Sequence, residues 1–81
     1  MISERGMPMA RFNVESEVSG NVWQIVVNVG DAVAEGDVLM ILESMKMEIP
    51  VESPRAGTLL ELCVATEQAV AEGQCVAVIQ A

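Results

Sequence analysis

The apolar residues of this chain gather in short segments separated by glycine-containing turns, and no segment shows the 3.6-residue period of an amphipathic helix. This pattern predicts a small all-β domain. Strands are expected around Phe12 and Val14 and over residues 22–29, 38–42 and 49–51. Turns are expected at residues 19–21, 30–31, 35–37 and 54–57.

The second predicted strand departs from strict alternation. Its expected core positions, Val22, Ile25 and Val27, are spaced by three residues and then by two. A β-bulge near Trp23 and Gln24 would account for this spacing, because the extra residue of a bulge interrupts the alternation of faces. Trp23 would then lie on the outer face, partly exposed, and cover one end of the fold.

The second half of the chain repeats the first at an offset of 37 residues. The pentapeptide Ala-Val-Ala-Glu-Gly at 32–36 recurs at 69–73, and Gly20 matches Gly57. An internal repeat of this kind predicts one supersecondary unit used twice. Because neither copy can bury its apolar face alone, the two copies should share a core. The expected architecture is a flattened antiparallel β-barrel or sandwich with a quasi-twofold axis.

The connection between the two copies holds the segment 43–48, Glu-Ser-Met-Lys-Met-Glu, between two apolar segments. Two strand-like segments this close together predict a β-hairpin with Lys46 at its tip. Lys46 is the sole lysine among the four basic residues, and its amine would project into water as a handle for acylation. The alternative is a solvated surface lysine whose methionine neighbours fill gaps in the core. Pro50 lacks a backbone N–H, so 49–51 is expected to be an edge strand.

Composition excludes several classes of function. The 81 residues suffice for one small domain with a compact core. A formal charge of −8 would repel phosphates, and Phe12 and Trp23 are the sole aromatic residues, so nucleic-acid binding is not expected. Without histidine, tyrosine or a glycine-rich phosphate loop, an independent active site is not expected either.

Cys63 and Cys75 are too few for a disulfide framework and have no neighbours with zinc-ligand spacing. They are expected to be two reduced thiols, with a single bridge between them as the alternative. There is no secretory leader and no apolar segment of membrane-spanning length, so we expect a cytoplasmic protein without a membrane partner. Residues 1–11 lack periodicity and are predicted to be a flexible tail, followed by the domain at 12–81.

The segment 43–48 closely resembles the Met-Lys-Met signature of biotinyl domains, the carrier modules of biotin-dependent carboxylases and decarboxylases. The resemblance covers roughly residues 14–80 and includes the turns at 30–31 and 35–37. In that family alanine usually stands where this chain has Ser44. The resemblance implies two four-stranded sheets with the modified lysine, here Lys46, on an exposed hairpin. The family's inserted "thumb" loop is missing after the second strand, so the chain resembles the thumbless type of pyruvate and propionyl-CoA carboxylases.

The resemblance also implies a function. Biotin protein ligase would attach biotin to Lys46 in amide linkage. The biotin arm would then carry carboxylate from biotin carboxylase to a carboxyltransferase, with the domain as a non-catalytic carrier that binds no metal. Met45 and Met47 would be read by the ligase and pack near the cofactor. Ligase recognition would also involve Glu43, Ser44 and Glu48.

Two alternatives share this fold. A lipoyl carrier domain of a 2-oxoacid dehydrogenase complex would present its lysine in the same place, but that family typically has Asp-Lys-Ala where this chain has Met45-Lys46-Met47. An unmodified interaction module, similar to the lipoyl-like parts of membrane-fusion adaptors, would need no lysine at the hairpin tip. The mass of the protein after expression with each ligase separates these possibilities.

Overall fold

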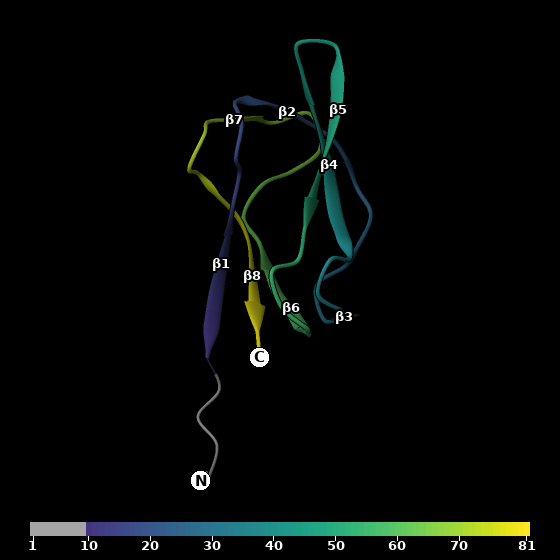
Figure 1. Ribbon diagram of the computed structural model, residues 1–81, viewed down its shortest axis with the longest axis vertical. Helices are drawn as coiled ribbons and strands as arrows, with labels where there is room; N and C mark the ends of the chain where they lie inside the picture. The colour runs from purple at the N-terminus through teal and green to yellow at the C-terminus, as the bar shows by residue number, and fades with distance from the viewer. Residues whose placement is uncertain (1–9) are drawn as a thin grey trace, which may run out of the picture.

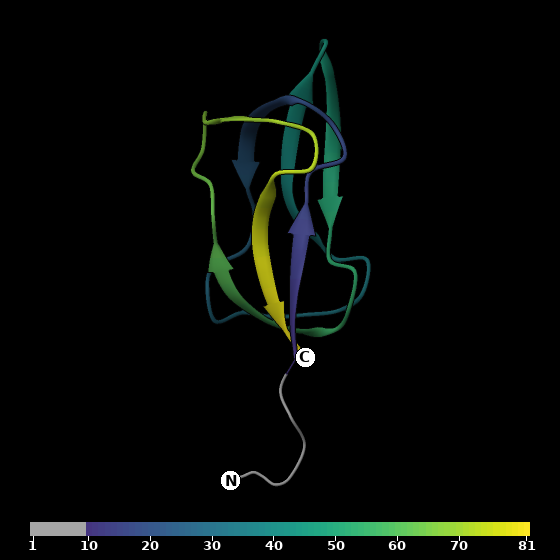
Figure 2. The same ribbon diagram turned by 90° about the vertical axis from the view of Figure 1, so that its left-hand side faces the viewer.

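The computed structural model describes residues 10–81, which form eight β-strands and no helix. The strands are β1 (Arg11–Glu15), β2 (Gly20–Ile25), β3 (Ala32–Val33), β4 (Val38–Ser44), β5 (Met47–Glu52), β6 (Gly57–Leu62), β7 (Ala69–Val70) and β8 (Cys75–Gln80). They pair as two four-stranded antiparallel sheets, ordered β1-β8-β6-β3 and β5-β4-β2-β7. The sheets face each other as a flattened sandwich that does not close into a barrel (Figures 1 and 2). The predicted fold class is therefore confirmed.

Each sheet takes two strands from each sequence repeat. Strands β1 and β3 of the first copy join β6 and β8 of the second, while β2 and β4 join β5 and β7. Each observed sheet therefore depends on strands from both copies, and the two copies share one core. No helix in the described part is long and apolar enough to cross a membrane.

The quasi-twofold relation extends to individual hydrogen bonds. The backbone N–H of Asn28 donates to the Asp31 carboxylate at 2.9 Å, and 37 residues later the N–H of Ala65 donates to the Gln68 side-chain oxygen at 3.1 Å. Each side chain accepts a hydrogen bond from a backbone N–H at a turn, where no strand partner is present. The two copies thus close their turns in the same way, with a carboxylate in one and an amide in the other.

The core lies between the sheets and holds the stem of the β4–β5 hairpin. The largest apolar side chains with no exposed surface are Leu39, Met40, Leu42, Leu59 and Ile79. Full burial of such a side chain stabilises the fold by about 1.5–3 kcal/mol. Three of these five side chains belong to β4, so the strand that leads to the hairpin tip is firmly anchored.

The predicted bulge in the second strand is confirmed. The pairing of β2 with β4 shifts register between Val22 and Gln24. Val22 is buried, while Ile25 and Val27 are partly buried against the core. Trp23 points outward and is 47% exposed, as the spacing indicated. Pro50 lies in β5, which is an edge strand of its sheet, so its missing N–H costs no ladder hydrogen bond.

The predicted turn at 19–21 is wrong. Gly20 is the first residue of β2, and the chain bends earlier, at Glu17 and Val18. Glycine is required at this position because β4 passes very close to it: a Cβ atom on Gly20 would lie 2.5 Å from the carbonyl oxygen of Glu43. The predicted strand 22–29 also differs, since the regular strand runs from Gly20 to Ile25.

The hairpin and the paired chain segments at Ala10 and Ala81 lie at opposite ends of the molecule (Figure 1). The N–H of each of these two residues donates to the carbonyl oxygen of the other, both at 3.0 Å. Ala10 and Arg11 therefore belong to the folded domain and not to the tail predicted over 1–11. The rest of that predicted tail, residues 1–9, lies outside the described residues.

Candidate functional site: the β4–β5 hairpin

The hairpin closes through a two-residue turn. Strands β4 and β5 pair from Val38 opposite Glu52 up to Ser44 opposite Met47, which leaves Met45 and Lys46 as the turn. Both residues have positive φ angles, 51° and 68° respectively. Positive φ at both central positions is the signature of a type I′ turn, whose twist matches that of the paired strands. The prediction that Lys46 lies at the tip of a hairpin is confirmed.

Methionine and lysine are not the residues that best form this type of turn. Type I′ turns favour Asn-Gly or Gly-Gly, because residues with a larger side chain are strained in the left-handed region. Each such residue costs about 1–2 kcal/mol. Met45 and Lys46 carry this strain at a position where asparagine and glycine would avoid it. A role for their side chains outside folding accounts for their presence.

All three tip side chains extend into solvent. Met45 is 92% exposed, Met47 is 64% exposed, and Lys46 is exposed between them. Within residues 10–81, the Lys46 amine forms no hydrogen bond with another side chain or with the backbone. Large apolar side chains grouped on an exposed tip indicate a contact with a partner, and methionine is enriched in such contacts. The alternative in which the two methionines fill gaps in the core is therefore excluded.

Two carboxylates flank the tip. Glu43 and Glu48 are exposed and lie directly opposite each other across the hairpin stem. Like charges at directly opposed positions destabilise an antiparallel pair. The stem thus carries a local negative charge that does not serve folding, next to a single positive amine.

Ser44 and Ser19 brace the base of the hairpin. The Ser44 hydroxyl donates to the carbonyl oxygen of Ser19 at 2.7 Å, and the Ser19 hydroxyl accepts from the backbone N–H of Glu72 at 3.3 Å. These bonds join the hairpin to the β1–β2 and β7–β8 connections. Ser44 could be assigned to the tip motif from the sequence, but the role of Ser19 could not be predicted. The hydrogen bond between the two residues spans 25 positions.

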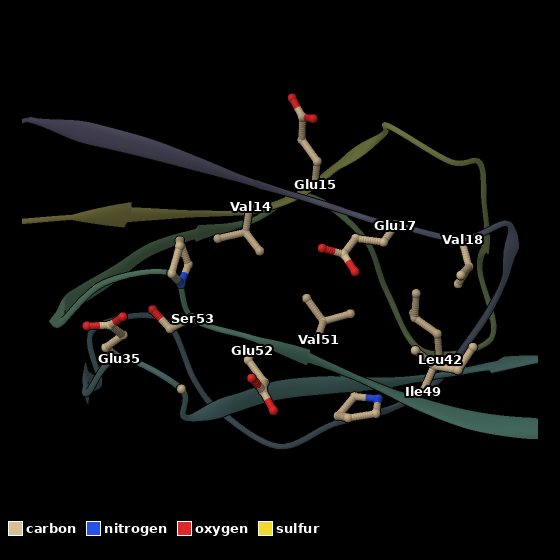
Figure 3. A pocket seen from close by; sticks show the side chains of 13 residues that line it. Val14, Glu15, Glu17, Val18, Glu35, Leu42, Ile49, Val51, Glu52 and Ser53 are labelled. Carbon is tan, nitrogen blue, oxygen red and sulfur yellow. The ribbon is translucent and has the colours of Figure 1, made fainter.

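A cleft of about 380 Å³ opens along the seam between β1 and β5, each of which is one edge strand of its sheet. Figure 3 shows Val14 and Val51 facing each other inside it. Its acidic lining residues are Glu15, Glu17, Glu35 and Glu52. Met45, Lys46 and Met47 do not line it, so the cleft and the hairpin tip are separate features. No three His, Cys, Asp or Glu side chains within 10–81 are grouped as a metal site.

Comparison with known proteins identifies the family. The profile described as "Biotin-requiring enzyme" matches residues 6–79, nearly the whole chain. This chain is a member of the biotin/lipoyl domain family. The biotinylated protein TB7.3 homolog of Mycobacterium leprae is 42% identical to it over 67 residues, which cover 83% of this chain and 94% of that protein. The sequence-based assignment to biotinyl domains is thereby confirmed.

Other biotin/lipoyl domains similar to this one are parts of much larger proteins. The urea amidolyase of Saccharomyces cerevisiae is 35% identical over 77 residues, 95% of this chain but 4% of that protein. The urea carboxylase of Kluyveromyces lactis matches with a TM-score of 0.83 at 32% identity, over 95% of this chain and 7% of that one. A single-chain, multi-domain long-chain acyl-CoA carboxylase, at 24% identity over 86% of this chain and 7% of that chain, shares the fold with a TM-score of 0.81.

Proposed function

We propose that Lys46 receives biotin through its side-chain amine and that this domain is the non-catalytic carrier component of a biotin-dependent carboxylase. The observation that carries the proposal is the exposed amine of the chain's sole lysine, raised on a two-residue turn between two exposed methionines. Family membership and the name of the Mycobacterium leprae relative, a biotinylated protein homolog, support biotin as the attached group.

The hairpin fits such a group. A primary amine can form an amide with a carboxyl group, and nothing in the described residues encloses Lys46 or blocks an approaching enzyme. The Lys46 Nζ atom, after losing one proton to the ligase, would attack the activated carboxyl carbon of biotin, and the activating group would leave with the bonding electron pair. The nitrogen would then release its second proton to solvent to give the amide. The formal charge of the chain moves from −8 to −9. When attached, biotin supplies a ureido nitrogen that accepts and releases carboxylate.

The domain itself contributes position and tethering. β4 is anchored in the core, so the tip presents the arm reproducibly to each enzyme it visits. Because the group stays attached, transfer between two active sites depends on the effective concentration set by the arm and not on free diffusion. The partners in this scheme are biotin protein ligase, biotin carboxylase and a carboxyltransferase. The acceptor of the carboxylate is an acyl-CoA, pyruvate or a urea-like compound.

The deciding experiment is to incubate the purified chain with biotin, ATP and a biotin protein ligase, and in parallel with lipoate, ATP and a lipoate ligase. Intact mass and peptide mapping then report the group attached and its position. We expect one biotinyl group on the peptide that contains Lys46. Lipoyl attachment alone would make the domain a lipoyl carrier, and no attachment in either reaction would favour an unmodified interaction module.

Met45→Leu combined with Met47→Leu is expected to leave folding unchanged and to slow biotinylation by about tenfold, which corresponds to about 1.4 kcal/mol. Both side chains are exposed, so the fold does not depend on their shape. The flexible thioether is lost while apolar character is kept, so the ligase contact is weakened selectively. The measurement is the ligase kcat/KM for this double variant. A rate equal to that of the parent chain would show that the ligase does not read the methionines.

A further inference from the structure

Two thiols lie close together away from the hairpin tip. The Sγ atoms of Cys63 and Cys75 are 3.8 Å apart, and both cysteines are free. Cys63 follows the end of β6 and is exposed, while Cys75 is the first residue of β8 and is half-buried. The N–H of Cys63 donates to the carbonyl oxygen of Val76 at 3.0 Å, which fixes the two backbone segments relative to each other.

We propose that Cys63 and Cys75 form a redox-active dithiol that is converted to an intramolecular disulfide by low-molecular-weight disulfides. A disulfide bond is about 2.05 Å long, so the sulfur atoms have to approach by somewhat less than 2 Å. Rotation about χ1 moves a sulfur atom by more than that without moving the backbone. The exposure of Cys63 gives a small disulfide access to the pair.

The internal repeat shows that sulfur is not needed at these positions for packing. At the offset of 37 residues, Cys63 corresponds to Val26 and Cys75 to Val38. The N–H of Val26 donates to the carbonyl oxygen of Leu39 at 3.1 Å, which is the same bond that Cys63 makes in the other copy. Val26 therefore makes the same backbone contact without a sulfur atom. The pair of thiols in the second copy adds a chemical property that the first copy lacks.

The reaction balances as two thiol–disulfide exchanges. The thiolate of one cysteine attacks a sulfur atom of oxidised glutathione, forms a mixed disulfide and expels glutathione thiolate, which takes up the proton. The second cysteine then loses its proton and attacks the protein-bound sulfur of the mixed disulfide. A second glutathione leaves. The protein dithiol loses two electrons and two protons, and oxidised glutathione becomes two molecules of reduced glutathione.

The surroundings of Cys63 slow the attack by this thiol at neutral pH. Partial burial of its sulfur atom, together with the adjacent Cys75 and the carboxylate of Glu61, raises the pKa of the Cys63 thiol above its ordinary value. A further carboxylate residue, Glu15, is opposite Cys75 on β1. A raised pKa lowers the thiolate fraction at pH 7, and the thiolate is the attacking species. Attack by Cys63 therefore becomes faster as the pH rises.

A disulfide bond between the two cysteines would restrict the segment between them, which lies next to the base of the hairpin. It would close a loop between positions 12 apart that contains β7, a two-residue strand paired with Gly20 and Asn21 of β2. Closing such a loop restricts the unfolded chain and raises the melting temperature, here by about 10 °C or more. Oxidation is thus expected to stabilise the domain.

The test is to incubate the full chain at pH 8 with millimolar oxidised glutathione, and to measure intact mass, reactivity with an alkylating reagent and Tm. We expect a loss of about 2 Da, because two hydrogen atoms leave, and no alkylation of either cysteine. The controls are Cys63→Val and Cys75→Val, which copy the residues of the other repeat. Each control should hold one glutathione as a stable mixed disulfide and show no such rise in Tm.

Three results would overturn the proposal. The parent chain could retain bound glutathione without forming a bridge, it could form disulfide-linked dimers, or its thiols could stay reduced at pH 8. Reduction of the oxidised chain should restore the original Tm, which separates the bridge from any irreversible change. None of these outcomes depends on biotin attachment, so the dithiol and the carrier function are tested separately.

Discussion

Replacing Lys46 with arginine is expected to reduce biotinylation to background while Tm stays within about 1 °C of the parent value. The guanidinium group keeps its proton under all physiological conditions and cannot act as the attacking amine. Lys46 is the chain's sole lysine, so no other lysine amine is present to replace it. The side chain is exposed, and its charge is retained in the variant, so folding is not affected. Streptavidin blotting and intact mass after ligase treatment provide the measurement.

A matched control tests whether the ligase needs the hairpin or only an exposed lysine. The double variant Lys46→Arg with Arg55→Lys places the amine on the exposed bend between β5 and β6. It is expected to remain unlabelled, because the methionines and the two-residue turn are absent there. Labelling of Lys46→Arg by the ligase would show that the attachment residue has been assigned incorrectly. Labelling of the double variant alone would show that the hairpin is not what the ligase recognises.

Gly20→Ala and Gly57→Ala are expected to destabilise the domain to the same extent, by about 2 kcal/mol each, but to differ in their effect on biotinylation. A Cβ atom on Gly20 would lie 2.5 Å from the carbonyl oxygen of Glu43 and 3.2 Å from the Cβ atom of Ser44, at the base of the hairpin. A Cβ atom on Gly57 would meet the carbonyl oxygen of Gln80 in the same manner. The two substitutions thus create the same collision at opposite ends of the molecule.

The shift required by Gly20→Ala falls on β4 directly below the tip, so the ligase kcat/KM is expected to drop by about tenfold or more. The shift required by Gly57→Ala falls on β8 at Gln80, next to the pairing of Ala10 with Ala81, and labelling should stay close to the parent rate. Urea denaturation gives the stability of both variants, and the ligase assay is run where both are folded. Equal labelling rates for the two alanine variants would show that the position of the hairpin base does not influence attachment.

The sequence predicted those features that follow from periodicity and repetition. The offset of 37 residues indicated the quasi-twofold relation, and the irregular spacing of Val22 and Ile25 indicated the bulge that the structure contains. The hairpin was predictable because strand-like segments flank a short polar connection that contains Lys46. The spacing and the hairpin are local properties of the chain, and the repeat is found by comparing the sequence with itself.

Other features depend on neighbours that are distant in the sequence. From the sequence Gly20 looks like a turn residue, because a glycine required by the close approach of Glu43 cannot be distinguished there from a glycine required by a turn. The positive φ angles of Met45 and Lys46 could not be predicted, because neither methionine nor lysine indicates a left-handed backbone conformation. The exchange of strands between the repeats could not be derived either, since two copies could also have formed one sheet each.

The pairing of Ala10 with Ala81 affects how this domain can be joined to another polypeptide. Entry and exit points that adjoin each other allow a folded module to be spliced into the surface loop of a host polypeptide, or fused at either side, without distorting either partner. Because this junction lies at the opposite end of the molecule from the β4–β5 hairpin, a host attached there leaves the turn that holds Lys46 pointing away from it.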